Sequence, residues 1–171
     1  MCARARGLHI ASSEPADLPT VEPRHPGGSP DDAADGPFPI QQALHDLPAF
    51  NDPSGVRIRY PVGHDNSPGP TTTWMRTVPL LPDEAPSPFQ RICALADSGN
   101  AISRNAQPEE VNFVNPDLTL VLHRNPVGEW LGSQAESHWQ PDGVGLADAL
   151  LFDEAGVVGR ALQTLVLRVP R

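Results

Sequence analysis

The chain has 171 residues, enough for one sizeable core but few for two complete domains. Its net charge of -9 and its lack of lysine argue against a nucleic-acid surface, because neutralising phosphates requires clustered basic side chains. No stretch approaches the roughly 20 apolar residues of a membrane-spanning helix. The two cysteines do not suggest a disulfide framework, because Cys2 lies at the extreme terminus and Cys93 lies inside a predicted helix. We therefore expect a cytoplasmic protein that binds neither nucleic acid nor membrane.

The first 50 residues carry little that could form a core. From Ala11 to about Pro39 the sequence is rich in Pro, Asp, Ser and Gly. Such a segment buries too little apolar surface to offset the entropy lost on ordering. The sequence predicts a mostly disordered linker here, preceded by a short strand over Ala3–Ile10 for which no partner is evident.

Two strands and a helix are predicted next. Val56–Tyr60 alternates apolar and basic residues, and Thr71–Val78 is rich in β-branched residues, as half-buried strands are. Ser87 has N-cap chemistry and Pro88 suits the first helical position. The helix continues to Gly99 with an apolar face, and the small side chains at its far end would let it lie close to a sheet.

The rest of the chain reads as four strands separated by turn residues, over Leu118–Arg124, Trp130–Trp139, Val144–Asp153 and Val157–Arg168. The short connections predict an antiparallel meander. In the third of these strands Gly145, Ala147 and Ala149 share one face, which suits contact with a helix. The predicted class is α+β, with one long helix packed on an antiparallel sheet over residues 51–171.

Several segments, taken in order, resemble the acyl-CoA thioesterase II-like family. They are Ser87–Asn100, Phe113–Leu120, His123–Arg124, Pro126–Trp130 and Gly159–Val166. The resemblance implies a hotdog fold, in which the sheet wraps around the helix, and an acyl-CoA or other acyl-thioester substrate. Members of that family usually carry two hotdog units. The resemblance therefore implies either that this chain is a fragment or wrongly started product, or that it forms a homodimer.

The resemblance also implies the residues that carry the chemistry. By position, Asp117 would hold or deprotonate the attacking water, while Gln163 and Ser137 orient it. The alternation of side chains along a strand supports an inward Gln163. It also favours Ser137, and not its neighbour His138, as the residue that points inward. Asp97 could also face this water, although it is more simply explained as a polar group at a helix end.

Other chemistries fit the sequence less well. The six histidines have no paired spacing suited to zinc, so we expect no metal and no cofactor. A Gly-x-Ser-x-Gly nucleophile elbow is absent. His123 is a candidate base for a hotdog dehydratase, but its neighbours match the thioesterase pattern. Two alternatives stay open beside hydrolysis, a non-catalytic acyl-binding or partner hotdog and an unstable truncated half.

Overall fold

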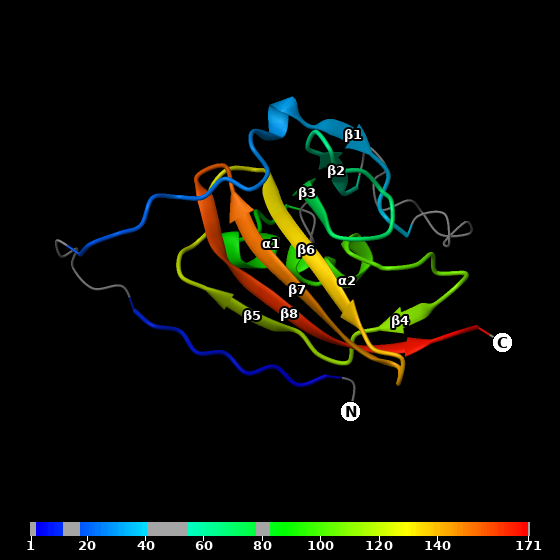
Figure 1. Cartoon of the computed structure of the whole chain (residues 1–171). Coiled ribbons are helices and arrows are strands. Elements are labelled where there is room, and N and C mark those ends of the chain that lie inside the picture. The colour runs from blue at the N-terminus through cyan, green and yellow to red at the C-terminus, as the bar shows by residue number, and fades with distance from the viewer. Residues whose placement is uncertain (1–2, 12–17, 41–54, 78–82, 171) are drawn as a thin grey trace.

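The structure, which is a computed structural model, describes residues 3–11, 18–40, 55–77 and 83–170. Its centre is one antiparallel sheet with the strand order β1-β2-β3-β6-β7-β8-β4, and β5 also pairs with β8. Figure 1 shows two short helices covering one face of this sheet. The strands are β1 (Ala34–Gly36), β2 (Arg57–Tyr60), β3 (Thr71–Arg76), β4 (Asn112–Val114), β5 (Thr119–Leu122), β6 (Leu131–Trp139), β7 (Val144–Asp153) and β8 (Gly156–Arg168).

The helical segment begins as predicted but is interrupted. In α1 (Pro88–Ala96), Ser87 accepts the N–H of Gln90, and the Gln90 side chain bonds back to the Ser87 N–H. The single long helix is wrong, because the chain leaves the helix at Asp97 and starts again as α2 (Gly99–Ile102). The Asp-Ser-Gly sequence at this point explains the break, since all three residues are poor in helix interiors.

The sheet face beneath the helices is lined by small side chains. Gly145, Ala147 and Ala149 alternate along β7 and are all buried. A Cβ atom on Gly99 would lie 3.1 Å from Oε1 of Gln163 and 3.6 Å from Cβ of Ala149, so α2 lies very close to the sheet. The predicted contact between small residues of helix and sheet is confirmed. Larger apolar side chains around it complete the core, including Ile58, Met75, Ile92, Leu95, Ile102, Leu131, Leu151 and Val158.

The C-terminal strands form a meander only in part. β6, β7 and β8 follow one another as neighbours, as predicted. The expectation that the strand before them pairs with β6 is wrong, because β3 occupies that edge of β6 and β5 pairs with β8 instead. The short strand β4, which the sequence analysis did not identify, pairs with the far end of β8.

β4 and β5 are two parts of one sheet edge, interrupted by a bulge. Between the pair Val114–Val166 and the pair Thr119–Leu162, the β4–β5 side has four residues, 115–118, and β8 has three. One extra residue bends the strand and changes the direction of its side chains. This bulge lies beside the end of α1, and it positions part of the candidate site described below.

Part of the segment predicted as a linker packs on the opposite, outer face of the sheet. Trp74, Trp130 and Phe152 form a small cluster there, and the Trp74 Nε1–H donates to the carbonyl of Gly27 at 3.1 Å. A Cβ atom on Gly27 would lie 2.7 Å from the Phe152 ring, so glycine is needed there. Residues 27–36 therefore belong to the folded unit, unlike the expectation, because they cover aromatic side chains.

The beginning of the described chain differs from the expectation too. Residues 3–11 form no strand, and in Figure 1 they pass below β5 without joining the sheet. Leu8 is 87% exposed and Ile10 is 86% exposed. Cys2, one of the two cysteines, and Val78, the end of the predicted strand Thr71–Val78, lie outside the described residues. Among the described helices, none is long and apolar enough to cross a membrane.

Candidate active site

A ring of hydrogen bonds joins the helix break to β8 and the bulge. At its centre is the carboxylate of Asp97, an exposed residue that follows α1. Its Oδ1 accepts hydrogen bonds from Nε2 of Gln163 at 3.1 Å and from Nδ2 of Asn115 at 2.9 Å. Oδ2 accepts none from the part of the chain that the structure describes. One oxygen of the carboxylate is thus held by two amides and the other is left open.

Gln163 contributes the buried amide of this ring. It is 1% exposed and points from β8 to the helix side, as its alternation with apolar residues predicted. Oε1 accepts the backbone N–H of Asn100 at 3.0 Å. Nε2 donates to the main-chain carbonyl of Asp97 at 3.1 Å as well as to its carboxylate. The helix break therefore supplies all the partners that a buried amide requires.

Asn100 and Asn115 close the ring. Nδ2 of Asn100 donates to Oδ1 of Asn115 at 3.0 Å, and Oδ1 of Asn100 accepts the N–H of Ala101 at 2.7 Å. Asn100 is 8% exposed at the start of α2, whereas Asn115 is half-buried in the bulge. The ring is thus assembled from the helix break, the bulge and β8, which are distant in sequence.

The structure does not bring Asp117 together with Gln163. The Asp117 carboxylate accepts the backbone N–H of Thr164 at 2.7 Å and its hydroxyl at 3.1 Å. Thr164 is exposed and faces away from the helices, while Gln163 beside it is buried beneath them. The physical reason is the bulge: Asn115 still shares the inward face of Phe113, whereas the extra residue leaves Asp117 at the exposed edge. There Asp117 binds a backbone N–H that the interrupted strand pairing does not use.

Ser137 is buried, as predicted, but its side chain is not part of the ring. In the sheet register Ser137 faces Ala147, and Ala147 faces Gln163, so one strand separates the two side chains. The Ser137 hydroxyl is 2.8 Å from the hydroxyl of Ser103, which donates to the carbonyl of Gly99. It therefore contacts α2 and not the amide of Gln163. His138, the alternative, is exposed.

Other chemically reactive side chains are distant from this ring or less suited to catalysis. His123 follows β5 at an exposed position, and its backbone N–H donates to the carbonyl of Val158, while its side chain makes no hydrogen bond with the residues that the structure describes. Burial raises the pKa of the Cys93 thiol, which disfavours the reactive thiolate. Within the described residues there is no cluster of three His, Cys, Asp or Glu side chains that could hold a metal ion.

The residues that sequence reasoning missed in this ring are Asp97 as a central group, Asn100 and Asn115. One signal was available, because Asp-Ser-Gly at positions 97–99 predicts a helix end, and a carboxylate there can turn toward the sheet. The positions of the two asparagines carried no such signal. Chemically, a carboxylate with one oxygen held and one open can accept a proton from a bound water molecule.

Solved structures share the fold. A thioesterase family protein from Silicibacter pomeroyi is 15% identical, with 77% of this chain and 97% of that chain covered and a TM-score of 0.54. An acyl-CoA thioesterase II from Mycobacterium marinum is 19% identical, covering 91% of this chain and 59% of that chain, with a TM-score of 0.53. A protein with a hotdog fold from Alicyclobacillus acidocaldarius is 16% identical, covering 95% and 59%, with a TM-score of 0.56.

These likenesses show a hotdog fold, and the chain spans only about three fifths of two of those relatives, at 59% of each. No curated protein sequence matches the chain. The family profile of the acyl-CoA thioesterase C-terminal domain, however, matches residues 20–167. The match begins inside the segment that sequence analysis assigned to a linker, and it extends through β8. Because it covers most of the chain, this protein belongs to the acyl-CoA thioesterase C-terminal domain family.

Proposed function

We propose that this protein hydrolyses acyl-CoA or other acyl thioesters, with Asp97 as the base. The observation that carries the proposal is the asymmetric environment of the Asp97 carboxylate. Gln163 and Asn115 both donate to Oδ1, which holds the carboxylate in one orientation. Oδ2 has no partner among the described residues and could accept a proton from water. Membership of a thioesterase domain family supports a thioester as the substrate.

In the proposed reaction a water molecule bound at Oδ2 attacks the carbonyl carbon of the thioester and transfers a proton to Asp97. The carbon–sulfur bond then breaks, and the thiolate that leaves takes the proton from Asp97. The products are a carboxylic acid and a thiol, and the carboxylate returns to its starting state. Gln163 and Asn115 keep Asp97 in place throughout, which lowers the entropy cost of reaching the transition state.

Asp117 and Ser137 take supporting roles in this proposal. Asp117 stabilises the bulge that positions Asn115, through its bonds to Thr164. Ser137 acts on α2 through Ser103, so that the start of α2 stays against Gln163. Both residues remain part of the proposed machinery, although neither would touch the reacting water in this arrangement.

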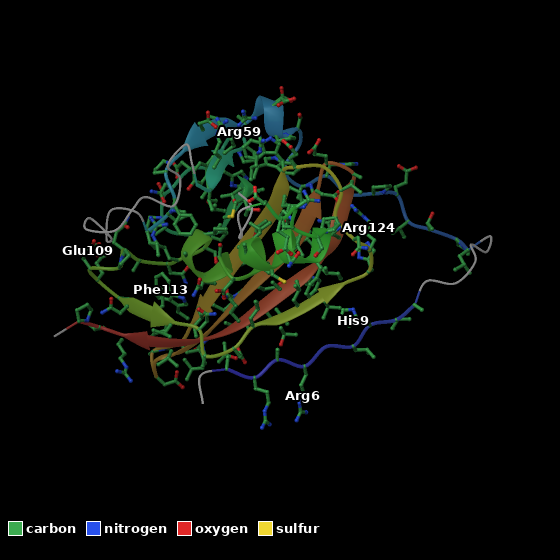
Figure 2. All side chains as sticks on the ribbon, turned by 180° about the vertical axis from the view of Figure 1, so that it is seen from behind. Arg6, His9, Arg59, Glu109, Phe113 and Arg124 are labelled. Atoms are coloured by element: carbon green, nitrogen blue, oxygen red, sulfur yellow. The ribbon has the colours of Figure 1, made fainter. Side chains whose placement is uncertain are left out.

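A partner unit is part of the proposal, because a developing oxyanion needs hydrogen-bond donors. In the ring, both N–H groups of Gln163 and one of Asn115 already bind Asp97. The edge formed by β4 and β5 has no strand beyond it among the described strands. Figure 2 shows this edge from the helix side, between Phe113 on β4 and Arg124 just after β5. We infer that a second copy of the chain pairs along this edge and completes the site.

The test compares two carboxylates. Asp97→Asn keeps an oxygen that can accept the two amide hydrogen bonds, so the fold should persist while the base is lost. We expect kcat on an acyl-CoA panel to fall by at least about 100-fold, the usual contribution of a general base. Asp117→Asn should reduce kcat much less, because its contacts are with Thr164. Steady-state kinetics with thiol detection measures both variants.

Two results would contradict the proposed function. A large loss in Asp117→Asn with little loss in Asp97→Asn would remove Asp97 as the base and restore Asp117. Binding of a non-hydrolysable thioether analogue of acyl-CoA by the unmodified protein, without turnover of any thioester, would instead support the non-catalytic acyl-binding alternative. Calorimetry with that analogue provides this measurement.

A further inference from the structure

Asn100 occupies a special place in the ring, because it uses three of its groups there. Its backbone N–H donates to Gln163, its side-chain Nδ2 donates to Asn115, and its side-chain Oδ1 accepts the N–H of Ala101. The residue is 8% exposed and sits immediately after the helix break. Each of the two amides that hold Asp97 is therefore in contact with Asn100.

These contacts set the direction of the amides. A backbone N–H can only donate, so the group of Gln163 that faces Asn100 must be its oxygen, and Nε2 is left to face Asp97. In the same way, the N–H of Ala101 donates to Oδ1 of Asn100, so Nδ2 of Asn100 must face Asn115. The oxygen of Asn115 turns to Asn100, and the Asn115 Nδ2 turns to Asp97.

We propose that Asn100 is a positioning residue, which orients Gln163 and Asn115 so that both present N–H groups, not oxygens, to the Asp97 carboxylate. If either amide turned over, its oxygen would face the carboxylate and repel it. The effect of Asn100 is thus transmitted through two other residues, and its side chain acts through Asn115 alone. This inference rests on the proposed role of Asp97.

Asn100→Asp is the sharpest variant, because it keeps the size of the side chain and its acceptor for Ala101. It loses the donor to Asn115, so a carboxylate oxygen of the variant would face Oδ1 of Asn115 and repel it. The Asn115 amide would then turn over, which directs its oxygen toward Asp97. We expect kcat on acyl-CoA to fall about 10-fold to 100-fold, as displacement of a catalytic group does, with KM within about twofold. The matched control is Asn125→Asp, since Asn125 is exposed and its side chain makes no hydrogen bond with the residues that the structure describes.

A double-variant experiment tests whether Asn100 acts through Asn115. Asn100→Ala keeps the backbone N–H to Gln163 and removes both side-chain contacts, the one to Asn115 and the one to the N–H of Ala101. We expect Asn100→Ala to lower kcat in the natural protein and to have almost no further effect in an Asn115→Ala background. An equal loss of kcat in both backgrounds, or a change confined to KM, would overturn the proposal. A thermal unfolding midpoint for each variant shows whether loss of folded protein explains the result.

A second readout is independent of activity, so failure of the proposed function and failure of this inference can be told apart. In nitrogen-15 NMR spectra, the side-chain amide hydrogens of Gln163 and Asn115 should exchange slowly with water, because both are hydrogen-bonded. In Asn100→Ala only those of Asn115 should exchange faster, by about 10-fold. Unchanged exchange at Asn115 would overturn the positioning role even if hydrolysis is observed. Altered exchange at Asn115 in a protein without hydrolysis would refute only the function.

Discussion

Asp153 shows how a single buried charge is compensated in this protein. Its side chain is fully buried and accepts two bonds from the Arg124 guanidinium, at 2.6 and 2.7 Å. The backbone N–H groups of Val127 and Ala155 complete its partners. Burial alone would raise the pKa of Asp153, but these hydrogen bonds outweigh it, so the pKa is lowered. The cluster ties the loop after β5 to the turn between β7 and β8.

Asp153→Asn should therefore lower the free energy of unfolding by about 3 kcal/mol at pH 7, because Arg124 would lose its buried counter-charge. The pKa of Asp153 is lower in the folded state, so its stabilisation is present above the ordinary value near 3.8 and is lost as pH falls through the lowered value. Urea unfolding of both proteins between pH 7 and pH 2 should show the difference shrinking below about pH 4.

Asp148→Asn is the matched control for this prediction. Asp148 also binds an arginine through two short bonds, but its partner Arg160 is 56% exposed. Exposed ion pairs contribute about 1 kcal/mol or less. A loss as large as that of Asp153→Asn, or a difference for Asp153→Asn that persists undiminished at pH 2, would contradict the account.

At the scale of elements, two irregularities build the candidate site. The helix break at Asp97 turns its main-chain carbonyl and its carboxylate toward β8. Asn115 reaches the same place from the inward face that it shares with Phe113, and the bulge turns Asp117 away from it. A continuous helix would carry Asp97 elsewhere, and a continuous strand would place Asp117 on the same face as Asn115. Such irregular elements need their own hydrogen bonds, and the side chain of Asp117 supplies two for the bulge.

Removing those bonds tests the bulge. Asp117→Ala should lower the free energy of unfolding by about 1–2 kcal/mol, as loss of a hydrogen-bonded carboxylate does. The backbone N–H of Thr164 should exchange faster with solvent, since Asp117 is its acceptor. Hydrogen exchange followed by NMR measures this residue by residue, and Gly143 N–H, which donates to the backbone of Gln140, should stay unchanged. Equal exchange at Thr164 in both proteins would refute the role of Asp117 in the bulge.

At the scale of the whole molecule, the β4–β5 edge is the surface that the proposed partner would use. Val121 on β5 is 63% exposed and Val114 on β4 is 64% exposed. An exposed apolar edge strand is a template for pairing with another chain. A second copy would bury these side chains and satisfy the free backbone groups of the edge.

Val121→Lys should disrupt this pairing without loss of the folded chain, because the position is exposed in the single copy. We expect the natural protein to elute as a dimer in size-exclusion chromatography with light scattering, and the variant to shift to the monomer with a fall in hydrolysis of at least about 10-fold. Val62→Lys is the control, since Val62 is 92% exposed in the loop after β2. A natural protein that is monomeric and fully active would exclude the paired site.

The sequence alone determined the features that depend on neighbouring residues. The Ser87 cap, the faces of β6, β7 and β8, and the inward direction of Gln163 all follow from short-range rules of hydrogen bonding and alternation. The combined motifs also pointed to the family whose profile matches the chain. These predictions held because each needs only the local conformation of one segment.

Only the tertiary structure decided how the site is assembled. Asp97, Asn115 and Gln163 lie on three segments, and their meeting depends on the register of β4 and β5 against β8. A bulge of one residue exchanges the faces of the positions that follow it, so Asn115 points inward and Asp117 does not. The sequence predicted a carboxylate beside the amide of Gln163. The one-residue shift and the break between α1 and α2 determine that this carboxylate belongs to Asp97 and not to Asp117.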